Sequence, residues 1–524
     1  MNYSQMRLLD LPDEILLLIL KKLNNIDILY SIFGFGYQRL DNLLQENTFT
    51  NTLNFVITTS DGDIYSFPYY IITRFCKYIL PKIDQNIQYL ILDSLSMENI
   101  LQAGNYPNLT QLKIFNFNDK VFDDYFTVQS SFGHIFQKQI TDLILIFEKD
   151  FNQILSKHYT IDMYDYILKF FKNLKHLSIN GLSHGFPPLT FRNLPFNVFF
   201  SSTLFKLSIH VMTFEDCLAL LDGRLEKLNT FIVVINPFIS YSSNLYHMDS
   251  LPNLQCFSLT FNSEFNEYDH YVRFLFPRMF NLKELTLHMT IYERNNLIDG
   301  NDINNNILIH MPRLNQFNFH ISTTMLRNNL IDHLSEDNTQ QTLSKLRFKQ
   351  LQCIIHCRCH LITCQIFSLP FIFDNLTCIG NKFPNIKFNN VKNLSIEDEI
   401  PFNHEFFIRR AWSFPLLKKL RILNLEPQLP SSSTNEIYSL IKYSHLSSLN
   451  ILDVHVDYIE QFLNDTKTCL PCLNELTVDY NQLQIATENF TKDRTRFNCK
   501  NVEKLNIKQK NIELEDFYTY FPLL

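Results

Sequence analysis

The stretch that decides the fold is FKNLKHLSI, residues 171–179. Apolar residues stand at Leu174, Leu177 and Ile179, separated first by two residues and then by one. The alternation of apolar and polar residues at the end of the stretch predicts a short strand with one buried face. The same spacing recurs along most of the chain, so it governs the whole fold and not one local element.

The other copies often follow Pro-x-Leu or Asn-Leu. Their first apolar positions recur every 22–34 residues or so, with a longer gap before Val391. The clear copies start at Leu109, Leu174, Leu204, Leu254, Leu282, Leu314, Val391, Leu417, Leu473 and Val502, and weaker copies start at Ile87, Ile140, Leu228, Leu343 and Leu446.

Helical patterns lie between these strands. The residues from Thr213 to Asp216 and from Ser433 to Glu436 both fit a capping box, and the segment from Ile161 has apolar residues at helical spacing. A strand followed by a helix in each unit predicts an α/β array with a parallel sheet on one face and helices on the other.

This pattern resembles the leucine-rich repeats, over about Ile87 to Leu524. The resemblance implies a solenoid with a curved parallel sheet and helices on its convex side. We expect residues 49–524 to form it, with a degenerate first unit at 48–86 and an irregular stretch at 343–391. The usual Asn after the last Leu is mostly absent, as in the diverged repeats of F-box proteins.

The chain begins with LLDLPDEILLLILKKLNNIDIL, residues 8–29. Pro12 suits the first turn of a helix, and Asp27 is expected to cap a second helix over 28–33. The first helix is apolar on nearly every side. Such a helix must be buried on every side, so another part of the chain or another protein should cover it.

The residues LPDEIL at 11–16, with the apolar positions that follow, resemble an F-box. The resemblance covers about Leu8 to Asn47 and implies a domain at 1–48 that docks on the Skp linker of a cullin-RING ubiquitin ligase. The expected contact residues are Leu11, Pro12, Ile15, Leu16, Ile19, Leu20 and Ile28. The stretch FGFGYQRL, residues 33–40, departs from the family's Cys-Arg-x-Trp-like pattern but keeps Arg39-Leu40.

Composition limits the classes of function. The chain is 46% hydrophobic and 19% charged, as folded proteins are, and its formal charge of -7 argues against a general nucleic-acid binder. No signal peptide is visible, and the apolar run at 15–20 is too short for a membrane span. We therefore expect a cytoplasmic or nuclear protein without a membrane partner, in which the 11 cysteines are thiols.

Some motifs suggest chemistry, but each has a simpler interpretation. Ser183 lies in a G-x-S-x-G, yet prolines follow where a hydrolase needs a helix. The C-x-x-C at 469–472 leads directly into a repeat strand. The cysteines and histidines at 353–364 match no paired zinc spacing. We therefore predict no catalytic, cofactor or metal residue.

The prediction is a non-enzymatic substrate-recognition adaptor of an SCF-type ligase, in which the repeats hold an unknown target protein. The alternative is a leucine-rich-repeat scaffold that acts without a ligase. Candidates for target binding are the strand residues of the concave face: Lys113, Ser178, Ser208, Thr286, Asn318, Ser395, Arg421 and Thr477.

Overall fold

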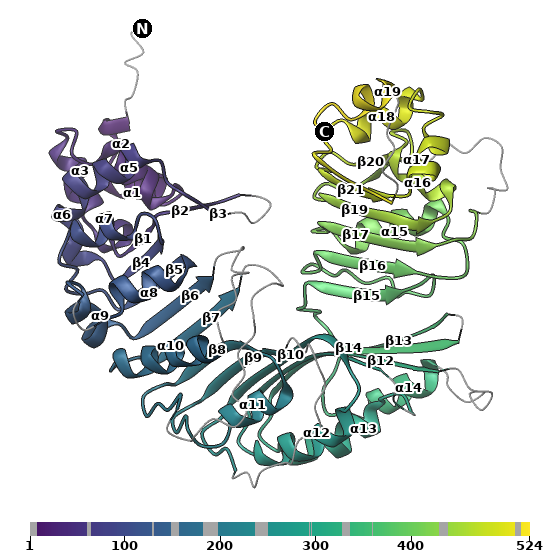
Figure 1. Ribbon diagram of the computed structural model, residues 1–524, viewed down its shortest axis with the longest axis horizontal. Helices are drawn as coiled ribbons and strands as arrows, with labels where there is room; N and C mark the ends of the chain where they lie inside the picture. The colour runs from purple at the N-terminus through teal and green to yellow at the C-terminus, as the bar shows by residue number, and fades with distance from the viewer. Residues whose placement is uncertain are drawn as a thin grey trace. The chain divides into compact units, whose positions relative to one another are not determined.

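The structure is a computed structural model that describes residues 8–59, 64–127, 130–147, 157–181, 198–235, 250–292, 294, 296–326, 336–358, 360–428, 439–508 and 515–524. The chain forms two compact units, Met1–Asn262 with Pro277–Lys283 and Ser263–Phe276 with Glu284–Leu524. The architecture is mixed α/β with a large, mostly parallel sheet of 12 strands (Figure 1). The boundary expected at residue 48 falls inside the first unit, so a separate N-terminal domain stays a prediction.

Short helices fill the first part of the chain. They are α1 (Asp13–Leu20), α2 (Asn25–Ile32), α3 (Gln38–Leu44) and α4 (Asn47–Thr50). α1 begins directly after Pro12, as predicted, but Asn24 and not Asp27 caps α2, because its side chain accepts a hydrogen bond from the Ile26 N–H at 3.1 Å. Asn caps a helix as well as Asp does, so α2 starts earlier than expected.

The large sheet has the strand order β1-β4-β5-β6-β7-β8-β9-β10-β11-β12-β14-β13. Adjacent strands from β1 to β10 pair in parallel, as the repeated pattern predicts. These strands are β1 (Thr52–Asn54), β4 (Tyr89–Asp93), β5 (Gln111–Phe117), β6 (Asp142–Phe147), β7 (His176–Gly181), β8 (Lys206–Val211), β9 (Thr230–Ile235) and β10 (Cys256–Phe265).

Between β1 and β4 the chain forms a hairpin and further helices. These are β2 (Val56–Thr58), β3 (Ile64–Ser66), α5 (Tyr69–Arg74), the π-helix η2 (Phe75–Ile79) and α6 (Leu80–Ile83). The segment 48–86 thus contributes one strand, β1, to the edge of the sheet.

One face of the sheet in the first unit is packed and the other is open. In β7, Leu177 and Ile179 are buried while Ser178 is half-buried, and in-register pairing stacks Leu143, Leu177 and Leu207. Each such Leu contributes about 1.5–3 kcal/mol by leaving water. We call the other side of each sheet its open face.

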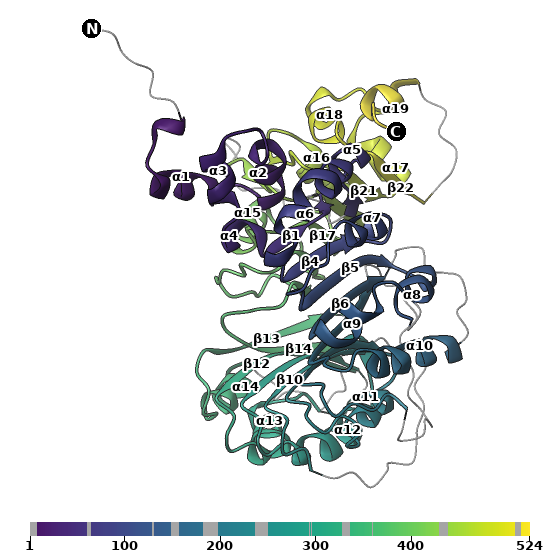
Figure 2. The ribbon, with the colours of Figure 1, turned by 90° about the vertical axis from the view of Figure 1, so that its left-hand side faces the viewer.

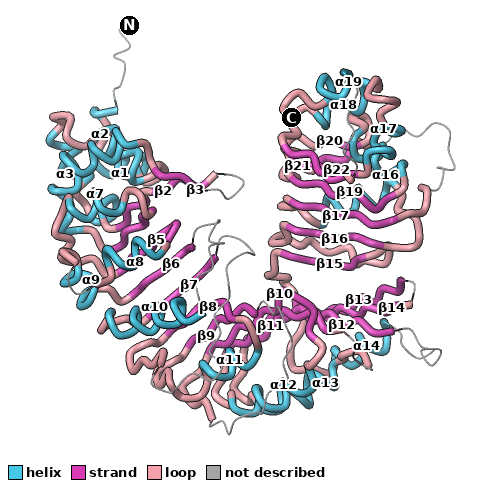
Figure 3. The backbone as a smooth tube through the Cα atoms, viewed as in Figure 1, coloured by secondary structure: helices cyan, strands magenta, loops and turns pink. Residues whose placement is uncertain are grey.

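Helices cover the packed face, and Figure 3 shows α9 and α10 along one side of β5–β7. Thr213 and Asp216 form the capping box that the sequence predicts. The helix expected from Ile161 is α10. The helices are α7 (Met97–Gln102), α8 (Asp119–Tyr125), α9 (Gly133–Gln139), α10 (Lys157–Phe170) and α11 (Phe214–Leu220).

The second unit continues with β11 (Glu284–Ile291) and β12 (Gln316–Leu326), which pair in parallel. The strand expected from Leu343 is wrong, because Leu343 lies buried in helix α14 (Glu336–Ser344). The stretch expected to be irregular instead forms a hairpin of β13 (Leu351–Arg358) and β14 (Leu361–Ser368). β14 is antiparallel to β12 as well as to β13, which ends the sheet.

A second parallel sheet has the order β15-β16-β17-β19-β21-β22. Figure 3 shows helices such as α16 and α17 beside its strands. The strands are β15 (Asn375–Ile379), β16 (Asn393–Glu397), β17 (Lys419–Asn424), β19 (Ser448–Val454), β21 (Glu475–Val478) and β22 (Lys504–Ile507). The helices are α15 (His404–Ser413), α16 (Val456–Leu463), α17 (Tyr480–Ala486), α18 (Asp493–Cys499) and α19 (Glu515–Tyr520). The capping box expected at Ser433–Glu436 lies outside the described residues.

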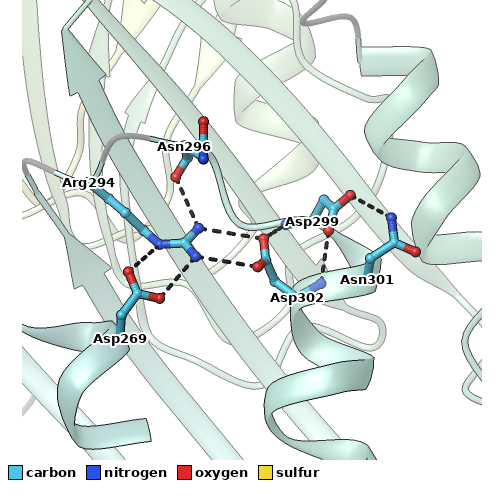
Figure 4. Close-up of polar contacts among 6 residues, drawn as sticks. All are labelled: Asp269, Arg294, Asn296, Asp299, Asn301 and Asp302. Atoms are coloured by element: carbon cyan, nitrogen blue, oxygen red, sulfur yellow. Dashed lines mark hydrogen bonds and ion pairs between the residues drawn. The ribbon is translucent and has the colours of Figure 1, made fainter. Parts of the chain in front are cut away.

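Arg294 joins two neighbouring helices of the second unit (Figure 4). Its guanidinium donates to Asp269 at 2.9 Å and 3.0 Å and to Asp302 at 3.3 Å. Asp269 belongs to α12 (Tyr268–Leu275) and Asp302 to α13 (Gly300–Asn306). Burial alone would lower the pKa of Arg294, but the hydrogen bonds to both carboxylates outweigh it and raise that pKa. These ion pairs therefore connect α12 and α13.

Within the described residues, no helix is both long and apolar enough to cross a lipid bilayer.

Candidate partner-binding site

Arg39 fixes the position of α1. Its Nε donates to Asp13 Oδ1 at 2.7 Å, and its Nη1 and Nη2 donate to the carbonyl oxygens of Leu9 and Leu11 at 2.8 Å and 2.7 Å. The chain turns back from α2 to α3 at Gly34 and Gly36, whose φ angles of 81° and 90° suit glycine. Arg39, which belongs to the Arg39-Leu40 pair that matches the F-box pattern, thus connects α3 to the start of α1. We call helices α1–α4 the helical module.

The helical module is attached to the sheet that follows it. Arg74 of α5 donates to the carbonyl oxygens of Tyr30 and Phe33 at 3.1 Å and 2.9 Å, and Asn25 donates to the carbonyl of Thr52 in β1 at 3.2 Å. The two hydrogen bonds from Arg74 satisfy carbonyl groups at the end of α2 that have no partner inside the helix. Together with the hydrogen bond from Asn25, they also hold the module in one orientation on the first strand.

One stripe of α1 and its C-terminal turn remains uncovered. Ile15, Leu18, Ile19 and Leu23 are 42%, 61%, 41% and 57% exposed, and we call them the bare stripe. Leu18 and Ile19 follow Ile15 by three and four residues and so share one side of the helix with it, and Leu23 follows Ile19 by four residues just beyond α1. Figure 2 shows α1 at the outside of the N-terminal helices, farther from β1 than α2. This part of the apolar surface of α1 is therefore exposed to solvent.

The expected linker contacts divide into two groups. Ile15, Ile19 and Pro12 are exposed and Leu11 is half-buried, so these can meet a partner. A correction applies to Leu16, Leu20 and Ile28, which are 0%, 2% and 1% exposed. These three form the interior of the module and present no side-chain surface. Leu18 and Leu23, which the prediction left out, are exposed beside Ile15 and Ile19.

The open face of the first sheet carries three of the predicted target-binding residues. Strand register places Lys113 beside Ile144, Ile144 beside Ser178 and Ser178 beside Ser208, in one row across β5–β8. All three predicted residues are half-buried. The register thus brings these three residues into one row, and their part in target binding stays a prediction.

A groove of about 240 Å³ lies on this face, between the row of Ser178 and the row at the start of the strands. Ser178 and Ser208 line it, together with Tyr89, Asp142 and Lys206. Pockets for drug-sized ligands are roughly 300–1,000 Å³. The size of the groove therefore suits a side chain of a protein partner better than a separate small molecule.

Some polar groups of the groove are hydrogen-bonded, either across neighbouring strands or within one strand. His176 Nδ1 lies 2.5 Å from Asp142 Oδ1, and Thr141 donates to the other oxygen of that carboxylate at 2.6 Å. Burial and the charge of Asp142 raise the pKa of Tyr89. The Ser178 hydroxyl accepts a hydrogen bond from Asn180 at 3.1 Å. The groove thus offers fixed donors and acceptors for recognition.

The β2–β3 hairpin packs on the same face beside the groove. Val56 packs with Phe115 and Ile146, and all three are buried. The Lys113 ammonium lies 4.4 Å from the centre of the Phe115 ring, and burial lowers the pKa of Lys113. The hairpin therefore limits the open surface to the part that holds Ser178 and Ser208.

The other predicted residues lie on open faces of the second unit. Thr286 pairs with Asn318 across β11 and β12, and Ser395 pairs with Arg421 across β16 and β17. Thr477 accepts a hydrogen bond from Asn506 at 3.2 Å. A hydrogen bond from Lys504 lowers the pKa of the neighbouring Glu475. These side chains form short rows, and their part in binding stays a prediction.

The sequence motifs for chemistry lie only partly within the described residues. Ser183 lies outside the described residues, as does Cys359. Cys472 donates to the carbonyl of Ser444 at 3.2 Å, before strand β21. Cys353 and Cys364 are buried thiols with their sulfurs 3.6 Å apart across the β13–β14 hairpin. No group of three or more potential metal ligands is present in the described part of the chain.

Comparison with known proteins leaves the chain without an assigned relative. No protein-family model matches the sequence, and no curated protein is significantly similar to it.

Proposed function

We propose that this protein is a substrate-recognition adaptor of an SCF-type cullin-RING ubiquitin ligase. In this proposal α1 docks on the Skp linker, which connects the protein to the cullin, and the open faces of leucine-rich-repeat-like sheets hold a target protein. The protein itself makes no covalent bond. It raises the effective concentration of the target beside the ubiquitin-conjugating enzyme.

The bare stripe is the observation that carries the proposal. Leu16, Leu20 and Ile28 are buried and fill the interior of the helical module. Ile15, Leu18 and Ile19 of α1 nevertheless remain exposed to solvent. Covering a large aliphatic side chain is worth about 1.5–3 kcal/mol. An exposed apolar stripe on a helix whose position is fixed by other contacts is the surface expected where a helix packs against a partner protein.

Co-purification with a Skp linker tests the proposal. The variant Ile15→Asp with Ile19→Asp places charges in the stripe without changing the interior of the module. We expect wild-type protein to retain the linker and the variant to lose it. Leu95→Asp is the matched control, because Leu95 is 80% exposed and lies outside the module. Equal retention by wild type and the double variant, or retention by neither, would refute docking.

The second candidate function is a repeat scaffold that acts without a ligase. Its support is the set of contacts from Arg74 and Asn25, which let the helical module cap the first strand of the sheet. A cap needs no partner, so the scaffold proposal expects no linker binding. Both proposals expect the target to bind the open face, and the co-purification separates them.

A further inference from the structure

A buried arginine in the second unit has no counter-charge among the described residues. Arg410 of α15 is 3% exposed, and its Nε and Nη1 atoms have no hydrogen-bond partner. Its guanidinium lies 4.5 Å from the centre of the Phe383 ring and 5.0 Å from that of Phe406. Burial lowers the pKa of Arg410 to about 10. Aromatic faces attract a cation but replace only a small part of its lost hydration.

Another buried arginine of the chain shows the usual arrangement. Arg224 is 2% exposed, and its guanidinium donates to Asp222 at 2.8 Å and 3.0 Å and to the carbonyl of Val198 at 3.0 Å. Buried charges in proteins are normally paired in this way. In the part of the chain that the structure describes, Arg410 forms no ion pair with a carboxylate, so its charge lacks the partner that Arg224 has.

Arg410 lines a cavity of about 160 Å³. Arg409, Glu405, Asn403 and Asn381 also line it, so its walls are mostly polar. Glu405 is paired with Arg409 and leaves Arg410 uncompensated. The volume equals the share of about five water molecules in the liquid, which is enough for one small anion.

The first turn of α15 adds to the positive character of the cavity. Asn403 caps the helix by accepting a hydrogen bond from the Phe406 N–H at 2.8 Å, so its amide NH₂ group remains as a donor. The N-terminus of a helix favours negative charge. A guanidinium is the side chain best suited to the oxygens of carboxylate and phosphate groups.

We propose that this cavity binds one oxyanion, a phosphate or carboxylate group, with the Arg410 guanidinium as its charged partner. Arg409 and the Asn403 amide complete the set of donors. The site lies in the second unit and is independent of linker docking by α1.

Thermal unfolding of the full chain in the presence of inorganic phosphate tests the proposal. The ionic strength is held constant with sodium chloride, and acetate is titrated in parallel. We expect the melting temperature to rise with phosphate concentration and to saturate. Fluorescence of Trp412, the single tryptophan of the chain and two residues beyond Arg410, reports binding separately. A stronger response to phosphate assigns the site to phosphate groups, and a stronger response to acetate assigns it to carboxylates.

Arg410→Met removes the charge and keeps the volume. Without phosphate this variant should melt at or above the wild-type temperature, because an unpaired buried charge is gone. It should lose the response to both anions. Arg224→Met is the matched control, which should melt lower and keep the response. Glu405→Gln should tighten phosphate binding by about threefold or more, because it removes a negative charge from the cavity wall.

An undiminished phosphate response in Arg410→Met overturns the proposal. So does an equal response to chloride alone. If Arg410→Met does not fold, weaker or unchanged phosphate binding in Glu405→Gln contradicts the assignment of the anion to this cavity.

Discussion

Arg39 Nε and Asp13 Oδ1 lie 2.7 Å apart, although the two residues are 26 positions apart in the sequence. The same guanidinium also donates to the carbonyl oxygens of Leu9 and Leu11. The first turn of α1 is thus held by α3 and not only by its own apolar interior. This contact keeps the bare stripe facing away from the protein.

Removing the Arg39 guanidinium should loosen α1. Both partners of the ion pair are about half exposed, so we expect Arg39→Ala to cost only about 1 kcal/mol in local stability. Amide hydrogen exchange should become faster in α1, and linker affinity should fall several-fold. Gln38→Ala, on the same exposed turn, is the control. Unchanged exchange in α1 after Arg39→Ala would show that the contact does not hold the helix.

The Arg294 network predicts a larger loss of stability in the second unit. Arg294 is 13% exposed and binds Asp269 and Asp302, so Arg294→Met leaves two carboxylates without their partner. We expect the free energy of unfolding to fall by about 2–3 kcal/mol. Lys169→Met removes an ion pair in which the lysine is 60% exposed and Asp165 keeps a hydrogen bond from the Phe199 N–H, so it should change the free energy by less than about 1 kcal/mol. Chemical denaturation measures both, and similar losses in the two variants would contradict the structural role of the network.

The pair of buried His320 and half-buried His288 predicts a loss of stability in acid. Burial lowers the pKa of His320 to about 3 and that of His288 to about 4, from about 6.5 in the unfolded chain. Between these values the unfolded chain binds more protons than the folded chain. Stability is therefore full above about pH 6.5 and falls as the pH falls. We expect His320 to account for about 2 kcal/mol between pH 7 and pH 5.

The variant His320→Gln tests this assignment, because Gln keeps a polar group near Gln365 but does not titrate. His320 Nε2 lies 3.1 Å from Gln365 Oε1 in the wild type. The free energy of unfolding, measured by denaturation at pH 7 and pH 5, should vary less with pH in the variant. A pH dependence equal to that of the wild type would show that His320 is not the titrating group.

The capping box of α11 gives a smaller and specific prediction. The Thr213 hydroxyl accepts a hydrogen bond from the Asp216 N–H at 3.2 Å, and the Thr213 N–H donates to Asp216 Oδ2 at 3.0 Å. Thr213→Ala should cost about 1 kcal/mol of stability, and Thr213→Ser should restore most of it. Equal stability of the Ala and Ser variants would exclude a capping contribution.

Much of the fold could be predicted from the sequence because each strand carries its own signal. The spacing of Leu177 and Ile179 indicates a strand with one buried face. The recurrence of that spacing along the chain indicates that successive strands pair in parallel. The signal fails at Leu343, where the same letters belong to the buried side of a helix. It also fails at β14, because this strand is buried on both faces and has no apolar–polar alternation to read.

The candidate site could be predicted only in part. The pattern around Ile15 indicates an apolar helix, but it does not say which leucines the module uses for its own interior. Leu16 and Leu20 are buried in the folded chain, which only the tertiary structure shows. Arg410 gave no signal in the sequence, since its missing counter-charge depends on residues such as Phe383 that pack around it.

The most direct test of the account is hydrogen–deuterium exchange of the full chain with and without a purified Skp linker. The account predicts that amides of α1, residues 13–20, and those up to Leu23 become protected on binding, while the rate in the groove around Ser178 is unchanged. A complex that forms while exchange in α1 stays unchanged would contradict the claim that the bare stripe is the docking surface.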